Sequence, residues 1–173
     1  MTRIAVAAGA LALAACASNA PQPPRRAYLP ASQQAAVSAA TYVAQGASID
    51  LFVIRSSELA LVRSPDAAVR DVAARFIADH QGTAAQLSLA GRRLDLLPGA
   101  NMLPQHQAMY DELAASSNFS ATYKRQQLAI HGAALRLHGD YSVIGGSATL
   151  RPVAANAAAV ERRHLAMLGQ LRP

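Results

Sequence analysis

Apolar residues recur at spacings of three and four along most of this chain, which is the period of an amphipathic helix. The clearest stretch predicts a helix from Ser64 to Arg93, with Ser64 as its cap, Pro65 at the first helical position and Asp66 adding favourable charge. His80 falls on the apolar face, so this helix is expected to carry a histidine on its buried side. That face consists of Val69, Ala73, Phe76, Ala84, Leu87 and Ala90.

Two segments flank this central helix. Ser32 to about Val62 predicts another long helix, although its stretch Leu51–Ile54 is apolar on every side and would also suit a buried strand. No turn residues flank that stretch, which favours a helix buried nearly all round. After the central helix, Asp95–Leu103 is typical of a loop, and Pro104 begins a short helix that runs through Ala115.

The C-terminal part predicts two more long helices. The first runs from its expected cap, Asn118, to the break at Gly145–Gly146, and the second starts at Ser147 or Thr149 and ends near Leu171. Four long helices and one short helix joined by short links predict an all-α fold, an antiparallel four-helix bundle with one extra short helix.

The composition agrees with an all-helical domain. Apolar residues make up 52% of the 173 residues, alanine is abundant, aromatic residues make up only 5%, and there is no tryptophan. This length suits a single domain. We therefore expect a signal peptide over residues 1–15, a lipidated cysteine and proline-rich tether over residues 16–31, and the bundle over residues 32–173.

The N-terminus resembles a bacterial lipoprotein signal. A short start with Arg3 is followed by an apolar run, Ile4–Leu13, that is too short to span a bilayer, and then by Ala14, Ala15 and Cys16. In such signals the cysteine is acylated, for example with palmitate, and becomes the new first residue. Because Cys16 is the only cysteine, no internal disulfide can form.

The expected location is the bacterial cell envelope. The residue after the cysteine is Ala17, not the aspartate that is the familiar signal for inner-membrane retention, so the outer membrane facing the periplasm is the expected site of anchoring. Proline and small polar residues as far as Ala31 predict an extended tether that holds the domain away from the membrane.

The charge pattern argues against nucleic acid as a partner. The net charge is +6, and all but one of the 16 basic residues are arginine, but they are scattered and form no stripe with aromatic residues. The expected partners are the membrane, through acylated Cys16, and an unidentified envelope protein or polymer. No nucleophile elbow, phosphate loop, His-Glu-x-x-His or Cys-x-x-Cys motif is present, so we expect no enzyme activity.

Several motifs together resemble the exported bacterial family called domain of unknown function 4142. The resemblance spans about Thr41–Leu171 and implies a ferritin-like helical bundle, often on a lipoprotein, with no settled biochemical activity. The motifs that carry it are Asp50-Leu51-Phe52, Arg55-Ser56-Ser57-Glu58-Leu59-Ala60-Leu61, Ala68-Val69-Arg70-Asp71, Asp79-His80, Phe119 with Tyr123 and His131, and His164-Leu165-Ala166.

The chain departs from that family at three positions. Val53 replaces a usual acid on the first helix, Ser120 replaces an aspartate that usually follows the Phe of the fourth helix, and Ala159 replaces a common proline. Two of the acids that could serve an ancestral metal site are therefore gone.

The remaining candidate ligands favour at most one ion. Ferritin-like metal centres use Glu-x-x-His pairs because residues i and i+3 share a helix face. This chain has one such pair, Glu161 with His164, together with His80 on the second helix and His131 on the fourth. These four residues could hold a single transition-metal ion such as zinc, copper or iron. Asp79 and Tyr123 are the expected outer partners.

The alternative is that these residues have ordinary structural roles. Asp79 could form surface ion pairs along its helix, and Glu161 could lie on a solvated face beside Arg162 and Arg163. The three histidines could bond to Tyr123 or Tyr141. His106 and His138 are expected at the surface. On the sequence alone, our first hypothesis is a structural or interaction role in the envelope without catalysis or cofactor, and the alternative is a metal-binding or oxidative-stress protein.

Overall fold

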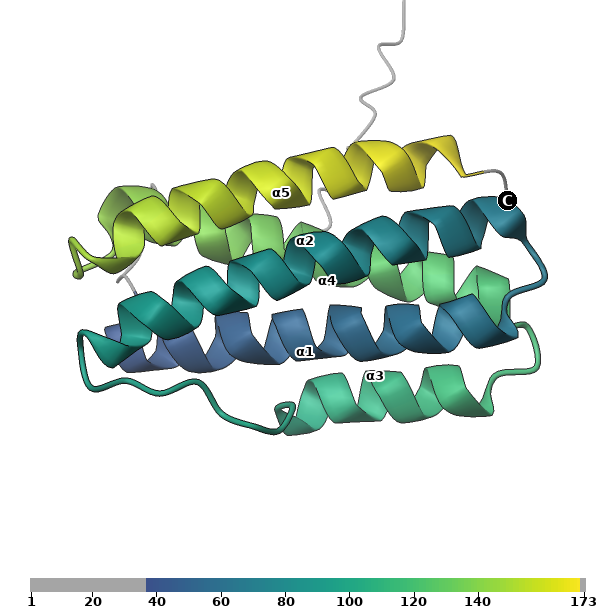
Figure 1. The fold of residues 1–173 in the computed structure, drawn as a ribbon, viewed down its shortest axis with the longest axis horizontal. Helices are drawn as coiled ribbons and strands as arrows, with labels where there is room; N and C mark the ends of the chain where they lie inside the picture. Colours follow the sequence, from purple (N-terminus) through teal and green to yellow (C-terminus); the bar gives the residue numbers. More distant parts are fainter. Residues whose placement is uncertain (1–36, 172–173) are drawn as a thin grey trace, which may run out of the picture.

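The computed structural model describes residues 37–171, and within this range it is all-helical, as predicted. Four long helices and one short helix are present, in agreement with the predicted bundle (Figure 1). Their bounds are α1 (Ala39–Arg63), α2 (Ala67–Arg92), α3 (Pro104–Ala115), α4 (Phe119–Ile144) and α5 (Leu150–Gln170). None of these helices is both long enough and apolar enough to cross a membrane.

The four long helices surround one core. Helix α1 packs against α2 and α4, and α5 packs against the same two helices from the opposite side. Neighbouring long helices run in opposite directions, as the colours in Figure 1 show. The short helix α3 runs back along the outside of the bundle, where it contacts α1 and α4, so it serves as the long connection between α2 and α4.

The helix ends explain one wrong prediction. Ser64 does not cap α2, because its backbone N–H bonds to the carbonyl of Ala60 and ends α1. The cap of α2 is Asp66, whose carboxylate accepts a hydrogen bond from the amide of Ala68. The hydroxyl of Ser64 instead accepts from the amide of Asp66 and bonds to the hydroxyl of Ser120.

A second cap was also predicted wrongly. Asn118 precedes α4, but its side chain makes no capping hydrogen bond. The apolar stretch Leu51–Ile54 forms part of helix α1 and not a strand, as predicted, and its residues Phe52 and Val53 are fully buried. In the connecting loop Met102 folds onto the core, whereas Leu97 is exposed.

Two apolar clusters lie along the bundle axis. The larger cluster is built around Phe52, Phe76 and Tyr123, and the smaller one around Tyr42 and Leu150. On α2 the residues of the larger cluster precede position 80 and those of the smaller cluster follow it. A layer of buried polar side chains therefore lies across the middle of the bundle, between two apolar regions.

The first helix was predicted from Ser32, but it begins later, at Ala39, because the Ser38 hydroxyl accepts a hydrogen bond from the amide of Thr41 and caps it. The predicted signal peptide, Cys16 and the tether fall in residues 1–36. These residues lie outside the described range.

Candidate metal centre

Four buried side chains meet in the polar layer at the middle of the bundle. They are His80 from α2, His131 from α4, and Glu161 and His164 from α5. Each offers one nitrogen or carboxylate oxygen, and these four atoms all lie within 4.8 Å of one another. None of the four residues is more than 1% exposed. The structure therefore brings together the four residues that the sequence offered as metal ligands.

The three imidazole rings form a nearly regular triangle. Their centroids are 5.3 Å apart between His80 and His131, 5.2 Å between His80 and His164, and 5.0 Å between His131 and His164. One carboxylate oxygen of Glu161 lies 4.0 Å from Nε2 of His80. Glu161 and His164 share a face of α5 because they are three residues apart.

Phe76 closes one side of this cluster. Its ring centroid lies 4.6 Å from that of His131 and 4.3 Å from that of His164. Phe76 is one helical turn before His80 on α2, so a single apolar face supplies both the aromatic wall and a histidine. This packing fixes two of the rings from the side of the larger apolar cluster.

One nitrogen of each histidine contacts a carboxylate; those of Asp50 and Asp79 come from outside the four clustered residues, and the third is that of Glu161 itself. Nδ1 of His80 lies 2.8 Å from Oδ1 of Asp50, and Nδ1 of His131 lies 2.5 Å from Oε2 of Glu161. Nε2 of His164 lies 2.9 Å from Oδ2 of Asp79. Carboxylates in this position fix the orientation and tautomer of an imidazole and make it a better metal ligand.

The other nitrogen of each ring has no hydrogen-bond partner. These buried atoms are Nε2 of His80, Nε2 of His131 and Nδ1 of His164. A buried polar atom without a partner is costly, typically about 1–3 kcal/mol, so native proteins rarely leave one in place without a reason. Here three such atoms belong to one cluster, together with the Glu161 carboxylate. An ion bound between them would give each nitrogen its missing partner.

Burial sets the charges of the four clustered groups. Burial raises the pKa of the Glu161 carboxyl, and it lowers the pKa of His131 well below the ordinary value and the pKa of His164 to about 4. For His80, burial is outweighed by the hydrogen bond and negative charge of Asp50, so the pKa of His80 is raised. Two of the three imidazoles are therefore neutral at pH 7, which is the form that binds a metal.

The donor set suits one divalent transition-metal ion. Imidazole nitrogens with a single carboxylate are typical ligands of zinc, copper and iron. Metal bonds of about 2.0–2.1 Å in a tetrahedral arrangement place the ligand atoms about 3.3 Å from one another. The four atoms would therefore draw together by an ångström or so around an ion.

The predicted outer partners have different positions. Asp79 contacts His164, as described above, whereas the hydroxyl of Tyr123 bonds to Ser57 at 2.8 Å. The sequence analysis did not identify Asp50 as a site residue, although it is an isolated acid beside the apolar stretch of α1. Asp50 accepts hydrogen bonds from both His80 and Thr83.

Several structural alternatives for these residues are wrong. Glu161 is buried in the core, because α5 turns it away from its arginine neighbours. His106 and His138 are also buried, each with a hydroxyl partner. Nδ1 of His106 lies 2.6 Å from the Ser48 hydroxyl, and Nδ1 of His138 lies 3.0 Å from the Tyr42 hydroxyl.

The structure places two of the positions where the sequence departs from the family that it resembles. Val53 belongs to the larger apolar cluster. Ser120 is eleven residues before His131 on α4, about 16 Å along the helix axis, and bonds to Ser64. Neither Val53 nor Ser120 is one of the four clustered residues.

Comparison with known proteins places the chain in a family and gives one structural neighbour. Residues 25–171 match the family described as "Domain of unknown function (DUF4142)". None of the curated proteins matches the chain. The solved structure described as "CopM in the Cu(II)-bound form" has a similar fold, with a TM-score of 0.67 and 15% sequence identity. The alignment covers 79% of this chain and 96% of that chain.

Proposed function

Because the chain belongs to the DUF4142 family, whose description names no activity, we propose a function from the site itself: this protein binds one divalent transition-metal ion in the cell envelope. The ligands are Nε2 of His80, Nε2 of His131, Nδ1 of His164 and a carboxylate oxygen of Glu161. This is the alternative hypothesis from the sequence, and the geometry now favours it over a purely structural role.

One observation carries the proposal. Each clustered histidine has one nitrogen held by a carboxylate, while its other nitrogen is buried without a partner. A histidine that only packs in the core requires no carboxylate partner, and it requires no other histidines nearby with unpartnered nitrogens. The partners of His80 and His164 are Asp50 and Asp79, which lie outside the four clustered residues, as outer partners of metal ligands do, whereas the partner of His131 is the clustered Glu161.

The proposed role is binding without catalysis. Four protein ligands complete a tetrahedral set around zinc, as in sites that hold an ion, whereas catalytic sites keep a position open for water or substrate. The ligands are also enclosed in the bundle core. We therefore propose ion storage, buffering or transfer. A structural or interaction role in the envelope stays a prediction of the sequence.

Copper(II) is the first ion to test. The structural neighbour is described in a Cu(II)-bound form, and imidazole-rich sites bind Cu(II) tightly. The 15% identity supports a shared fold only, so the choice of copper rests on the donor set and not on a shared site. Zinc is the second choice, because it accepts the same ligands.

The test of the function is a metal titration of the full chain carrying Cys16→Ala, which removes the only thiol as a competing ligand. Calorimetry with Cu²⁺ or Zn²⁺ alone should show one ion per chain. A His80→Ala, His131→Ala, His164→Ala triple variant should lose that binding. The matched control is a His106→Ala, His138→Ala double variant, which removes two other buried histidines and should keep it.

Circular dichroism first establishes that all the variants are folded, so that a loss of binding reports the loss of ligands and not unfolding. Stoichiometric binding by the parent and the control, but not by the triple variant, supports the proposal. If the parent binds no ion, the metal function is wrong. If the triple variant binds as tightly as the parent, the ion is held elsewhere and this site is wrong.

We further propose that the protein is attached to the outer membrane, facing the periplasm, through acylated Cys16. The support is the sequence of residues 1–17, in which a short apolar run and small residues precede the cysteine. Several acyl chains on one residue would give a stable anchor, whereas one chain would not. In cells, Cys16→Ala should move the protein from the membrane fraction to the soluble fraction. Unchanged retention in membranes would contradict the anchor.

A further inference from the structure

The four ligands are enclosed, so an ion needs a passage to reach them. Each clustered histidine contacts a carboxylate, of Asp50, Glu161 or Asp79, and the three carboxylates differ in their exposure to solvent. Asp50 and Glu161 are 4% and 1% exposed, whereas the side chain of Asp79 is 40% exposed. Of the three, only Asp79 offers a carboxylate that is open to water and also bonded to a proposed ligand.

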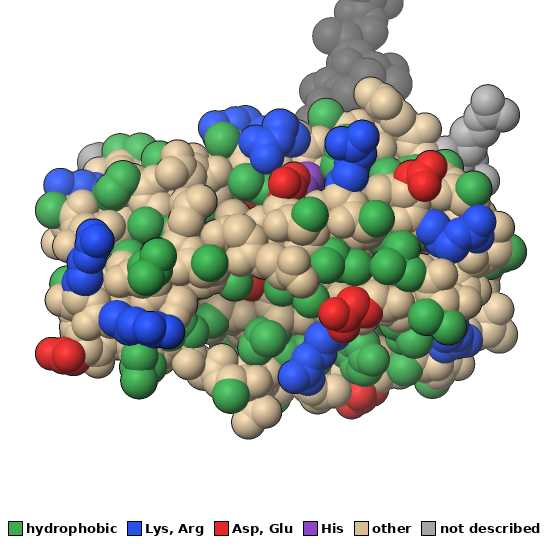
Figure 2. Space-filling view, viewed as in Figure 1, with side chains coloured by type: hydrophobic (Ala, Val, Ile, Leu, Met, Phe, Trp, Pro, Cys, Tyr) green, Lys and Arg blue, Asp and Glu red, His purple; other side chains and the backbone are tan. Residues whose placement is uncertain are grey.

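Only the imidazole ring of His164 lies between the Asp79 carboxylate and the unpartnered nitrogen of that ring. Nε2 of His164 contacts the Asp79 carboxylate, and Nδ1 of the same ring is the unpartnered atom of the cluster. On the outside, a guanidinium nitrogen of Arg163 lies 3.5 Å from the same Asp79 oxygen. In Figure 2, histidine atoms are visible on one part of the face shown, beside an acidic side chain and among basic ones.

The competing passage is a hollow between α1 and α2. It has a volume of about 360 Å³, and Asp50, Ala84 and Arg92 are among its lining residues. The carboxylate of Asp50 is held from two sides, by Nδ1 of His80 at 2.8 Å and by the Thr83 hydroxyl at 2.7 Å. Asp79 is also paired on two sides, but its side chain is 40% exposed, whereas that of Asp50 is 6% exposed, so Asp79 is the carboxylate that a hydrated ion can reach.

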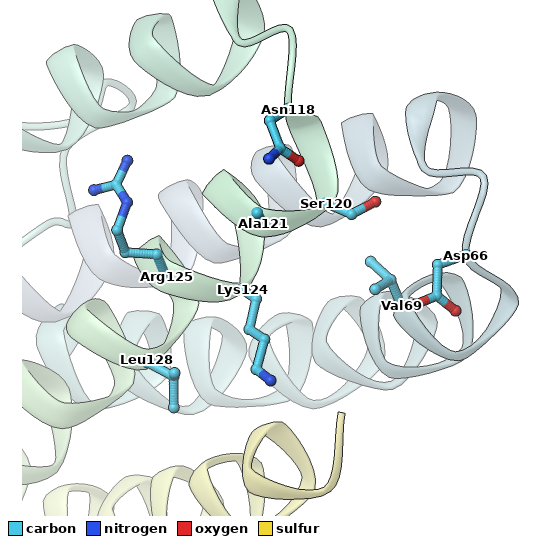
Figure 3. A pocket seen from close by; sticks show the side chains of 8 residues that line it. All are labelled: Asp66, Val69, Asn118, Ser120, Ala121, Lys124, Arg125 and Leu128. Carbon is cyan, nitrogen blue, oxygen red and sulfur yellow. The ribbon is translucent and has the colours of Figure 1, made fainter. Parts of the chain in front are cut away.

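A larger hollow, of about 720 Å³, lies near the starts of α2 and α4 (Figure 3). Its wall includes Val69, Ala121 and Lys124, and none of the four proposed ligands lines it. It therefore gives no access to the cluster and provides a place for control substitutions.

We propose that the bound ion is exchangeable and that it enters and leaves between α2 and α5. Asp79 is the first carboxylate that the hydrated ion meets, and His164 is the ligand that receives it. Arg163 pairs with Asp79 and restrains this passage. The inference rests on the proposed metal function, and it makes the ion a cargo that the protein takes up and releases.

The test is a measurement of uptake and release rates in the full chain carrying Cys16→Ala. Uptake of Co²⁺ is followed by its visible absorption in stopped flow, and release is followed after mixing with excess EDTA. Asp79→Asn should slow uptake by roughly tenfold, the lower end of what electrostatic attraction contributes to association rates. The matched control is Asp71→Asn, which removes the same charge from an exposed position on α2 and should leave uptake unchanged.

A second pair of variants tests whether Arg163 slows passage of the ion, and neither variant changes a residue that bonds to a histidine. Arg163→Ala should speed uptake and release by the same factor, about threefold, and leave the Kd unchanged, because exposed ion pairs have weak effects. Arg162→Ala removes the same charge from the adjacent exposed position and is the control for general attraction of cations. If Asp79→Asn binds too weakly to measure, this pair decides the question.

Two results would overturn the passage while leaving the metal function intact. One is uptake by Asp79→Asn at the rate of its control, with only release accelerated, which would mean that Asp79 affects affinity alone. The other is slower exchange in Ala84→Phe, which fills the hollow beside Asp50, with no change in Ala121→Phe, which fills the hollow of Figure 3. Absence of Co²⁺, Cu²⁺ and Zn²⁺ binding by the parent would instead reject the proposed function.

Discussion

The five histidines of this protein are all buried, yet they fall into two kinds. His80, His131 and His164 each contact a carboxylate through one nitrogen and leave the other without a partner. His106 and His138 each contact a hydroxyl, and neither has a fully buried nitrogen without a partner. Burial alone therefore does not distinguish a ligand from a structural histidine. The two kinds are distinguished by the partner of the first nitrogen, a carboxylate or a hydroxyl, and by whether the second nitrogen is buried without a partner.

The two kinds also differ in their neighbours. The centroids of the three clustered rings lie 5.0–5.3 Å apart, and one ligand atom of each ring and of Glu161 lies within 4.8 Å of the others. His138 instead packs edge-on against Tyr42, which stacks on Tyr141 in the smaller apolar cluster. A hydroxyl can accept or donate, so it satisfies a neutral imidazole without bringing a charge into the core. This difference predicts which substitutions change metal binding and which change only stability.

The largest expected effect is stabilisation by the ion. At a free Zn²⁺ concentration 100 times the Kd, binding to the folded state alone should raise the free energy of unfolding by about 2.7 kcal/mol. His80→Gln should abolish most of this gain, because the cluster loses one ligand. His106→Gln should keep it. The measurement is urea unfolding with Zn²⁺ and with chelator; an equal gain in both variants would show that the two kinds of histidine are not distinct.

The second effect concerns the pair of His131 and Glu161 without metal. Glu161→Leu leaves Nδ1 of His131 buried without its partner and should lower the free energy of unfolding by about 1–3 kcal/mol. Adding His131→Leu removes both polar groups, and stability should return to within about 1 kcal/mol of the parent. Urea unfolding in the presence of chelator measures both. Losses that simply add in the double variant would show that the two residues are not energetically coupled.

The helix pattern could be predicted because it depends on spacing. Apolar residues at intervals of three and four located long helices, Pro104 located the short helix, and Pro104 and Gly145 marked helix ends that the structure confirms. The start of α2 was missed because Ser64, Pro65 and Asp66 form one continuous cap signal. Which oxygen caps the helix depends on where the chain turns after α1, and spacing along the chain does not determine that.

The candidate site was predictable only in part. Histidines near apolar stripes and the Glu161-x-x-His164 spacing identified the four residues. Their convergence depends on the relative rotation of α2, α4 and α5, which a single sequence does not give. Asp50 was missed for the same reason, since its role appears only when α1 faces α2. His106 was placed at the surface because α3 is weakly amphipathic and its buried face is defined by contact with α1.

The smallest expected effect is the pH dependence contributed by a single structural histidine. Burial lowers the pKa of His106, so the unfolded chain binds a proton at this residue more readily than the folded protein. Its contribution to stability is therefore complete above the unfolded pKa of about 6.5 and is lost as the pH falls below it. His106→Gln should lose less stability than the parent between pH 7 and pH 5, because each tenfold difference in proton affinity between the two states is worth about 1.4 kcal/mol. Urea unfolding at the two pH values, with chelator present, isolates this difference because every other titrating group is common to both proteins. Identical pH dependence would mean that His106 binds a proton equally well in the folded and unfolded states, which would contradict the lowered pKa.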